Sequence, residues 1–265
     1  MNLLPQHTAQ NKYRLNIGSF AKIIWHQIKE LIWPTTCGAC GQIIAPLPNH
    51  NTSALCPACY HKLTIITPPI CQHLGTPLPY DLGKEAHSPA ALASSLHHIS
   101  RVRTASLYKG TAQTLVHNLK YRNMPQLAQL MATLMRQNFN ALVTDKSILV
   151  SVPLHPVRLW QRGYNQAELL CHQLENYSGC IHYPALKRIK NTAPQVGLTK
   201  QQRQENLQNG FKLAPQFIGL VTGQNVILVD DVFTTGATAQ ACAHQLHLAG
   251  ARTVDLAVFA TVPLA

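Results

Sequence analysis

The chain has 265 residues, with 22 Lys and Arg against 10 Asp and Glu and a formal net charge of +12. This length allows one core of ordinary size and a small accessory module, and the charge favours polyanionic partners such as phosphorylated compounds or nucleic acid. No apolar run reaches the roughly 18 residues that cross a bilayer, and no secretory pattern opens the chain. We therefore expect a cytoplasmic protein without a transmembrane segment, whose eight cysteines are not a disulfide framework.

Residues 1–34 are expected to form an N-terminal extension that contains an amphipathic helix over 16–33. The apolar residues with helical spacing are Ile17, Phe20, Ile24, Ile28 and Leu31. Such a helix either packs against its own protein or contacts a membrane surface or a partner.

Four cysteines form two Cys-x-x-Cys pairs with 15 residues between them. This spacing is typical of a tetrahedral thiolate site for structural zinc, because each pair supplies two sulfurs from one tight turn. The alternatives are reduced unliganded thiols or a redox pair, although no thioredoxin-like βαβ pattern lies nearby. We predict a zinc-ribbon-like module over 35–75, with the metal ligands Cys37, Cys40, Cys56 and Cys59.

A third stretch, Cys71-Gln72-His73-Leu74, has the form of another cysteine pair in which the second cysteine is replaced by leucine. It is either a vestigial turn, or Cys71 and His73 are substitute metal ligands. The Pro-, Ala- and Ser-containing stretch over 76–100 is typical of a linker, so we place a domain boundary there and a second domain over 101–265.

The second domain alternates apolar runs of strand length with amphipathic runs of helix length. This alternation predicts an α/β fold with a parallel sheet, whose ligands bind beyond the carboxyl ends of the strands. The expected strands are 102–108, 147–152, 226–229 and 253–259, and the main expected helices are 111–120, 127–139, 166–174 and one from about 237 to Leu248.

Two basic stretches of this domain are candidates for ligand contact. Lys120-Tyr121-Arg122 is either a surface helix end or a contact to ligand. The polar stretch from Leu186 to Asn206, which contains Arg188 and Arg203, fits a mobile lid that closes cations over phosphates and excludes water. An ordinary solvated loop is the alternative for this stretch.

Residues 225–240 carry the strongest signal in the chain. The apolar run 226–229 is expected to end at Asp230 and Asp231, and the turn Thr234–Thr238 opens the next helix. Free backbone N–H groups at a helix N-terminus, with a glycine that allows close approach and threonine hydroxyls as donors, form an anion cradle. The two acids can accept hydrogen bonds from sugar hydroxyls and help hold a divalent cation. The alternative is a polar turn that merely ends a strand.

This string resembles the ribose-5-phosphate motif of type I phosphoribosyltransferases, which bind phosphoribosyl pyrophosphate (PRPP) together with Mg²⁺. The resemblance implies that the 5′-phosphate lies on the turn, the ribose on the two acids, and the pyrophosphate on the loop after the strand 147–152 and on Arg162. The implied PRPP-binding residues are Asp230, Asp231, Thr234, Thr235, Gly236, Ala237, Thr238, Pro153, Leu154, His155 and Arg162. The implied catalytic residues are Asp230, Asp231, Arg188 and Arg203.

An ordered set of motifs over about residues 30–260 resembles the ComF (competence protein F) family. The motifs are Leu31-Ile32-Trp33-Pro34 before the two cysteine pairs, Lys120-Tyr121-Arg122, Val152-Pro153-Leu154, Arg162-Gly163-Tyr164-Asn165-Gln166, the spaced series Arg188, Thr192, Gln195, Leu198, Arg203, Asn206, and Val229 to Thr238. The family implies a zinc-ribbon-like module fused to a type I phosphoribosyltransferase domain, and a role in the use of imported DNA. Family members carry more N-terminal cysteine pairs, so Leu74 puts a second metal site in doubt.

Two classes of function follow. In the first, the protein is a phosphoribosyltransferase with structural Zn²⁺, with Mg²⁺ bound alongside PRPP and with an unidentified acceptor. In the second, it is a non-catalytic, PRPP-binding regulatory or DNA-binding factor, with single-stranded DNA and other competence or DNA-processing proteins as partners. A nucleotide-salvage phosphoribosyltransferase unrelated to competence is a further alternative. The sequence alone shows no interleaved aromatic and basic platform for a DNA strand.

Overall fold

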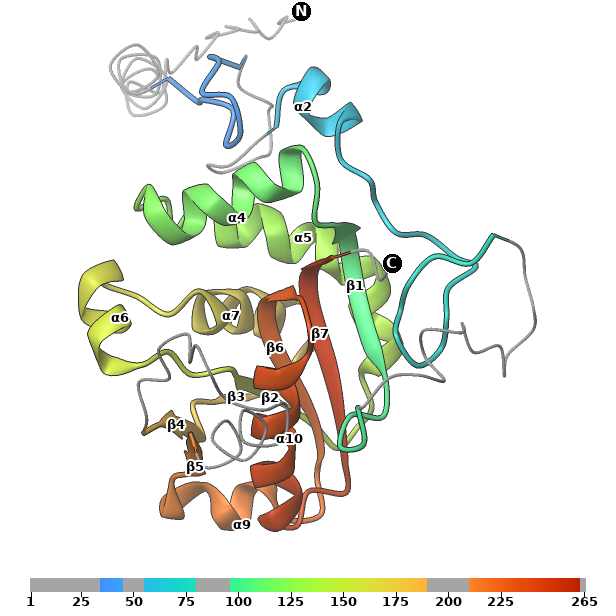
Figure 1. The fold of residues 1–265 in the computed structure, drawn as a ribbon, viewed down its shortest axis with the longest axis vertical. Coiled ribbons are helices and arrows are strands. Elements are labelled where there is room, and N and C mark those ends of the chain that lie inside the picture. The colour runs from blue at the N-terminus through green and yellow to red at the C-terminus, as the bar shows by residue number, and fades with distance from the viewer. Residues whose placement is uncertain (1–33, 45–54, 80–95, 190–209, 263–265) are drawn as a thin grey trace, which may run out of the picture.

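A computed structural model describes residues 34–44, 55–79, 96–189 and 210–262. Its centre is a five-stranded parallel sheet in the order β1-β7-β6-β2-β3 (Figure 1). The strands are β1 (Val102–Leu107), β2 (Ser147–Ser151), β3 (His182–Tyr183), β6 (Asn225–Phe233) and β7 (Thr253–Thr261). The predicted α/β class with a parallel sheet is confirmed, whereas the helix predicted over 16–33 lies outside the described residues.

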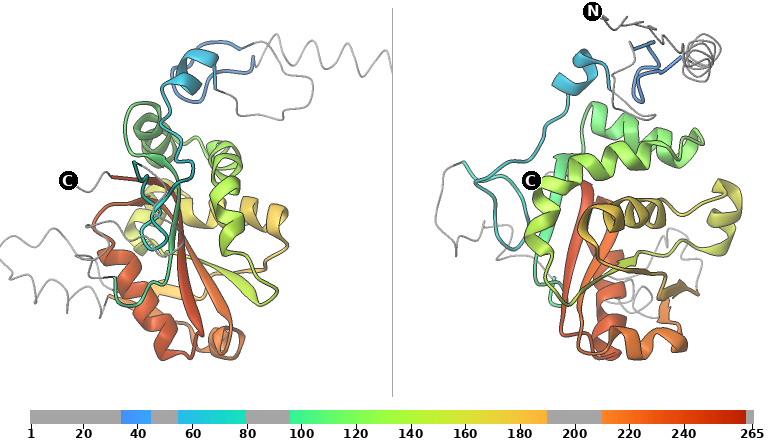
Figure 2. Two further views of the ribbon diagram at one scale, coloured as in Figure 1. Left: turned by 90° about the vertical axis from the view of Figure 1, so that its right-hand side faces the viewer. Right: turned by 180° about the vertical axis from the view of Figure 1, so that it is seen from behind.

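Helices cover both faces of this sheet (Figure 2). One face is covered by α5 (Leu127–Phe139) and α7 (Gln166–Ser178), with α4 (Thr111–Tyr121) packed against α5, and the other face is covered by α10 (Ala237–Leu248). The remaining elements are α2 (Pro57–His61), α6 (Pro156–Arg162) and α9 (Ile218–Val221), the short 3-10 helices Asn140–Leu142 and Pro215–Phe217, and an antiparallel pair formed by β4 (Leu186–Arg188) and β5 (Phe211–Leu213).

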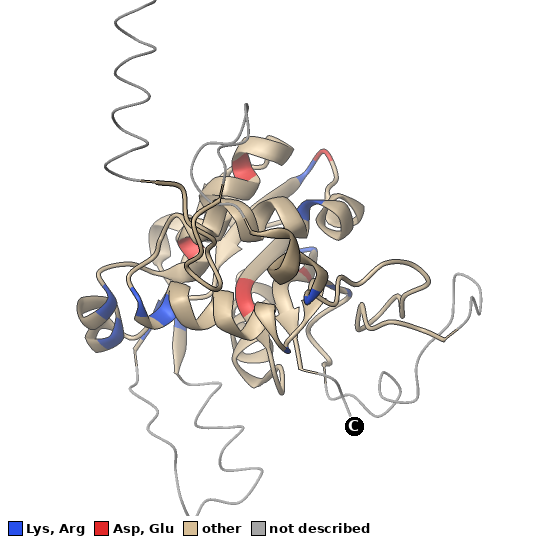
Figure 3. Ribbon diagram, turned by 90° about the horizontal axis from the view of Figure 1, so that it is seen from above, with Lys and Arg blue, Asp and Glu red and all other residues tan. Residues whose placement is uncertain are grey.

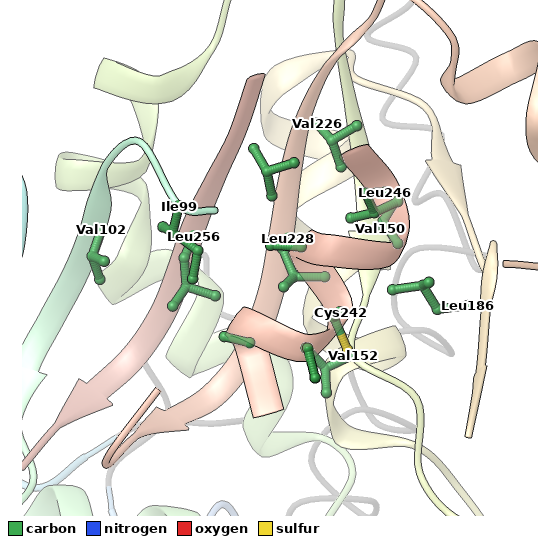
Figure 4. Packing of buried hydrophobic residues seen from close by; sticks show 14 of the residues in the cluster. Ile99, Val102, Val150, Val152, Leu186, Val226, Leu228, Cys242, Leu246 and Leu256 are labelled. Atoms are coloured by element: carbon green, nitrogen blue, oxygen red, sulfur yellow. The ribbon is translucent and has the colours of Figure 1, made fainter. Parts of the chain in front are cut away.

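The apolar run of β6 divides its side chains between two cores because successive strand residues face opposite sides of a sheet. Val226 and Leu228 pack with α10, and Figure 4 shows them beside Cys242 and Leu246 of that helix. The intervening Ile227 and Val229 belong to the core on the other face, where α7 packs on β6. Burial on both faces explains why this run is continuously apolar.

The expectation that β6 ends at the two acids is wrong, because the strand continues to Phe233. Its neighbour β7 pairs with it along this extra length, with Asp230 opposite Val258 and Phe233 opposite Thr261. The strand β2 on the other side stops earlier, at Ser151 opposite Val229. The backbone at the acids is therefore held on one side only.

A helix that the sequence analysis did not anticipate, α6, follows β2. Pro156 occupies its first turn, where a missing N–H costs nothing. Gly163 ends it in the left-handed conformation, with φ of 75°. No side chain of α6 is buried, so this helix projects from the domain.

The segment that follows the cysteine pairs lies along the outer edge of β1. Ile66 N donates to Ala105 O (2.8 Å), Leu107 N donates to Thr64 O (3.0 Å) and Val102 N donates to His73 O (2.7 Å). These bonds satisfy backbone groups that an edge strand would otherwise expose. The cysteine module is thus joined to the sheet by backbone hydrogen bonds.

Both cysteine pairs contact α4, and the first pair also contacts α5. Asn118 Nδ2 donates to Gly38 O (2.9 Å), and Thr111 Oγ1 donates to Cys59 O (2.9 Å). A Cβ atom added to Gly38 would lie 2.4 Å from Leu127 Cδ2, so a larger residue here would force the Leu127 side chain to move.

The turn at Cys71 repeats the backbone of the first cysteine turn. Cys37 N donates to Gln42 O and Gly41 N to Cys37 O, and in the same way Cys71 N donates to Thr76 O and Gly75 N to Cys71 O. Cys71 and Leu74 are buried in the core beneath α10. This geometry favours the vestigial reading of the stretch, with its side chains packed into the domain.

None of the helices in the described residues is long and apolar enough to cross a membrane.

Candidate functional site

The four cysteines of the N-terminal pairs converge on one point. Their Sγ atoms all lie within 4.8 Å of one another, and Cys40 Sγ lies 3.8 Å from Cys56 Sγ. Tetrahedral zinc with Zn–S bonds of about 2.3 Å holds its sulfurs about 3.8 Å apart. The set therefore fits structural zinc, and within the described residues it is the group that could hold a metal ion.

The pKa values of these thiols show why a cation is needed. Burial raises the pKa of Cys37, but hydrogen bonds from the backbone N–H groups of Cys40, Cys56 and Ala39 outweigh it and lower the value to about 6. Burial and the neighbouring sulfurs raise the pKa of Cys59 to about 12. Without a cation Cys37 ionises readily whereas Cys59 resists ionisation, and bound zinc would stabilise the thiolate form of its ligands.

The two acids of β6 have different partners. Asp231 is buried, and its Oδ1 lies 2.7 Å from Lys120 Nζ at the end of α4. Asp230 accepts a hydrogen bond from the N–H of Asp231 (2.8 Å). Lys120, for which the sequence allowed either a surface position or a ligand contact, forms an ion pair with Asp231.

The pKa of Asp230 is raised to about 7. Burial is the main cause and the adjacent charge of Asp231 adds to it, while Lys120, the N–H of Asp231 and Arg188 act in the opposite direction. A carboxyl group poised near neutrality beside a turn is a frequent feature of functional sites.

The threonine turn and Asp230 line one small cavity of about 60 Å³, together with Val232, Phe233, Thr234, Thr235, Gly236, Ala237, Thr238, Ala239, Leu256 and Val258. The helix α10 begins at Ala237, so its N-terminal N–H groups and partial positive charge face this space. Gly236 has φ of 75°, and an added Cβ would lie 2.7 Å from Leu96 Cδ2 and 2.8 Å from Phe233 Cε2. Glycine is required here by both the backbone and the lack of room.

The loop Pro153–His155 leaves the sheet next to the acids. Val152 N donates to Val229 O (3.0 Å), immediately before Asp230 on β6. Asn165 Nδ2 donates to Val152 O (3.1 Å), and Asn165 Oδ1 caps α7 by accepting from Ala167 N (3.1 Å). His155 caps α6, with Nδ1 accepting from Val157 N (3.3 Å).

The predicted arginines occupy separate places. Arg188 on β4 stacks over the Phe211 ring at 5.4 Å, and burial is the main cause that lowers its pKa, with Asp230 opposing. Arg162 lies over the Tyr121 ring at 5.1 Å, beside Lys120 and away from the turn cavity. Arg203 and most of the predicted lid lie outside the described residues.

A second feature, which the sequence analysis did not find, is an open groove of about 740 Å³ between α4 and α6. Its lining contains no acidic residue: Lys120, Tyr121, Asn123, Arg158, Trp160, Gln161, Arg162, Gly163 and Tyr164. Trp160 is 85% exposed and Tyr121 is 65% exposed. Figure 3 shows the basic residues of α6 at the left edge of the ribbon. We call this feature the α4–α6 groove; the alternation Arg158-Leu159-Trp160-Gln161-Arg162 was the signal for it.

Comparison with known proteins adds to this description. A family model described as "Double zinc ribbon domain" matches residues 28–91. The "DNA utilization protein YhgH" of Salmonella typhi is 35% identical over 164 residues, which cover 59% of this chain and 70% of that protein. The "Competence protein F" of Haemophilus influenzae is 38% identical over 112 residues, which cover 41% of this chain and 47% of that protein.

A solved structure of "the allosteric regulatory enzyme of purine biosynthesis" aligns with 54% of this chain and 29% of that chain, with 14% sequence identity and a TM-score of 0.38. At this TM-score the likeness adds nothing to the geometry described above.

Zinc removal is expected to destabilise the protein, because the hydrogen bonds between the cysteine pairs and α4 depend on the turns that surround the metal. A reduced sample treated with chelator should melt several degrees lower than the untreated protein. Cys40→Ser should lose the zinc and the response to chelator, whereas Cys180→Ala should keep both. Metal analysis and thermal unfolding check this, and a chain that holds no zinc and ignores chelator would contradict the site.

Asp230→Asn is expected to stabilise the fold near neutral pH. A carboxyl whose folded pKa is about 7 binds a proton that the unfolded chain has released above about pH 4, so stability falls as pH rises between these values. Asparagine removes this loss, so the variant should exceed the wild type in unfolding free energy at about pH 8, by at most a few kcal/mol, and match it more closely at about pH 5.

Asp231→Asn is the matched control, since it leaves Lys120 without its buried partner. It should cost about 3 kcal/mol. Denaturant unfolding of both variants at the two pH values measures these effects, and a destabilised Asp230→Asn protein at about pH 8 would refute the assignment.

Proposed function

The chain belongs to the ComF family of competence proteins, and from this premise we propose that it binds PRPP at the Asp230 edge of the sheet. In this proposal it acts in the cytoplasm, in the uptake and use of transforming DNA. The observation that carries the proposal is that Asp230 and the turn Thr234–Thr238 line a single cavity at the start of α10.

The turn suits a phosphate monoester. The N-terminal N–H groups of α10 and the threonine hydroxyls are donors, and Gly236 brings the backbone close. Asp230 lines the same cavity, and its carboxylate can accept hydrogen bonds from the hydroxyls of a ribose attached to that phosphate. A donor surface and an acceptor that line one cavity are the two elements that ribose 5-phosphate requires.

The pyrophosphate is assigned to the loop Pro153–His155, which leaves the sheet beside Asp230. Arg188 and Arg203 are the cations proposed to neutralise the pyrophosphate. The charge of Arg188 already acts on Asp230, whose pKa it lowers. Mg²⁺, when bound with PRPP, neutralises phosphate oxygens and makes pyrophosphate a better leaving group.

If the protein is a transferase, the C–O bond between the anomeric carbon and pyrophosphate breaks and a bond to an acceptor nitrogen forms. Pyrophosphate leaves with the bonding electron pair, and the acceptor nitrogen gives up its proton to water. The arginines stabilise the negative charge that develops on the leaving oxygens. The acceptor is unassigned, so PRPP binding is the core of the proposal and transfer is its extension.

A cytoplasmic location fits the metal site. Four thiols within 4.8 Å of one another serve as zinc ligands only while they stay reduced, and the cytoplasm keeps them so. The names of the relatives, "DNA utilization protein YhgH" and "Competence protein F", point to the handling of DNA.

The α4–α6 groove favours a second candidate function, direct contact with single-stranded DNA. Cations that face a strand's phosphates and aromatic rings on which bases stack are the usual elements of such a surface. The groove combines Lys120, Arg158 and Arg162 with the exposed rings of Trp160 and Tyr121. This function is compatible with PRPP binding, because the residues that line the groove and those that line the turn cavity are different.

Calorimetric titration with PRPP, with and without Mg²⁺, tests the principal proposal. The wild type should bind PRPP more tightly with Mg²⁺, and Asp230→Asn should lose at least tenfold in affinity, a loss of about 1.4 kcal/mol. Asp145→Asn removes the same charge from an exposed position and should bind like the wild type. Absence of binding at millimolar PRPP, or an unchanged Asp230→Asn protein, would refute the site.

Fluorescence anisotropy with a labelled oligonucleotide tests the DNA candidate. Affinity should fall steeply with added salt, as phosphate contacts require. Trp160→Ala should weaken binding by about 1–3 kcal/mol, the usual contribution of one stacked base. Leu248→Ala, which removes an exposed apolar side chain from α10, is the control. A Trp160→Ala protein that binds like the wild type would assign the DNA contact elsewhere.

A further inference from the structure

The neighbouring acids of β6 point to opposite faces of the sheet. Asp230 lines the turn cavity on the α10 side, whereas Asp231 does not line it and instead meets Lys120 on the α4 side. This divergence follows from the extended backbone that β7 maintains through both residues. The two carboxylates therefore do not form a pair of parallel ligands.

Asp231 already has a full positive charge beside it. Its side chain is 5% exposed and that of Lys120 is 23% exposed, and the Nζ–Oδ1 distance is 2.7 Å. A buried carboxylate needs such a counter-charge, which a bound divalent cation supplies in many acidic sites. Here an ammonium group from the protein occupies that place.

The last turn of α4 holds Lys120 in position through its neighbours in the chain. Asn118 Nδ2 donates to Gly38 O of the first knuckle (2.9 Å), and Leu119 O accepts from the Tyr164 hydroxyl (2.6 Å). Tyr121 lies under the Arg162 guanidinium at 5.1 Å. With residues 118, 119 and 121 all engaged, the turn has little freedom to withdraw Lys120.

We propose that Lys120 is a positioning residue, the built-in counter-ion of Asp231, which keeps a divalent cation off that carboxylate. In consequence Asp231 would hold no divalent cation before PRPP arrives, and Asp230 would be the one of the two acids available to a Mg²⁺ ion bound together with PRPP. This second statement rests on the proposed function, whereas the first does not.

The test measures Mn²⁺ binding to the zinc-loaded protein without PRPP, by loss of the free Mn²⁺ signal in electron paramagnetic resonance. Lys120→Met should bind Mn²⁺ at least tenfold more tightly than the wild type, because Asp231 is left without a counter-ion. Lys120→Arg keeps the charge and should resemble the wild type. Lys109→Met removes a lysine from an exposed position of the same domain and is the control for net charge.

The double variant Lys120→Met with Asp231→Asn removes both charges. It should fold at least as well as Lys120→Met and should lose the gained Mn²⁺ affinity, which locates the new site at Asp231. Equal Mn²⁺ affinity in Lys120→Met and the wild type, or an equal gain in Lys109→Met, would overturn the proposal.

PRPP titrations on the same proteins separate this inference from the proposed function. If the wild type does not bind PRPP but Lys120→Met gains Mn²⁺, the counter-ion role stands and the PRPP site fails. If the wild type binds PRPP with Mg²⁺ and Lys120→Met gains no Mn²⁺, the PRPP site stands and the counter-ion role fails.

Discussion

The backbone pairing of β6 with β7 beyond the end of β2 is the constraint on which the candidate site depends. It keeps Asp230 and Asp231 extended, so one carboxylate reaches the turn before α10 and the other reaches α4. Beyond Val229 the β2 side of β6 has no strand pairing within the described residues, and the loop Pro153–His155 leaves the sheet there, directly after Val152. A single asymmetry of strand length thus arranges the acids, the threonine turn and the loop around one edge.

Much of this organisation follows from local sequence. The helix 127–139 matches its predicted limits, and α10 ends at Leu248 as expected, because the apolar spacing and the following Gly250 are strong signals. The four thiols converge as their spacing predicts. The fold class and the metal site are therefore readable from one chain.

The features that could not be predicted from the sequence depend on contacts between segments that are distant in the chain. Asp230 and Asp231 look like strand terminators until β7 pairs with them, and Lys120 looks like a surface lysine until α4 is packed beside β6. The α4–α6 groove joins Tyr121 to Trp160 from two separate helices, one of which, α6, has no buried side chain to give it an amphipathic pattern. Tertiary pairing overrides local propensity at each of these places.

The turn at Cys71 helps to attach the N-terminal segment to the sheet by contacts that do not involve the zinc ligands. Cys71 and Leu74 are packed in the core, and the segment around them bonds to β1 through its own backbone. In a zinc-starved cell the two cysteine pairs would lose their ion and their hydrogen bonds to α4. The backbone hydrogen bonds along the outer edge of β1 would remain. A fold with this arrangement can tolerate scarcity of a nutrient metal without exposing a strand edge to aggregation.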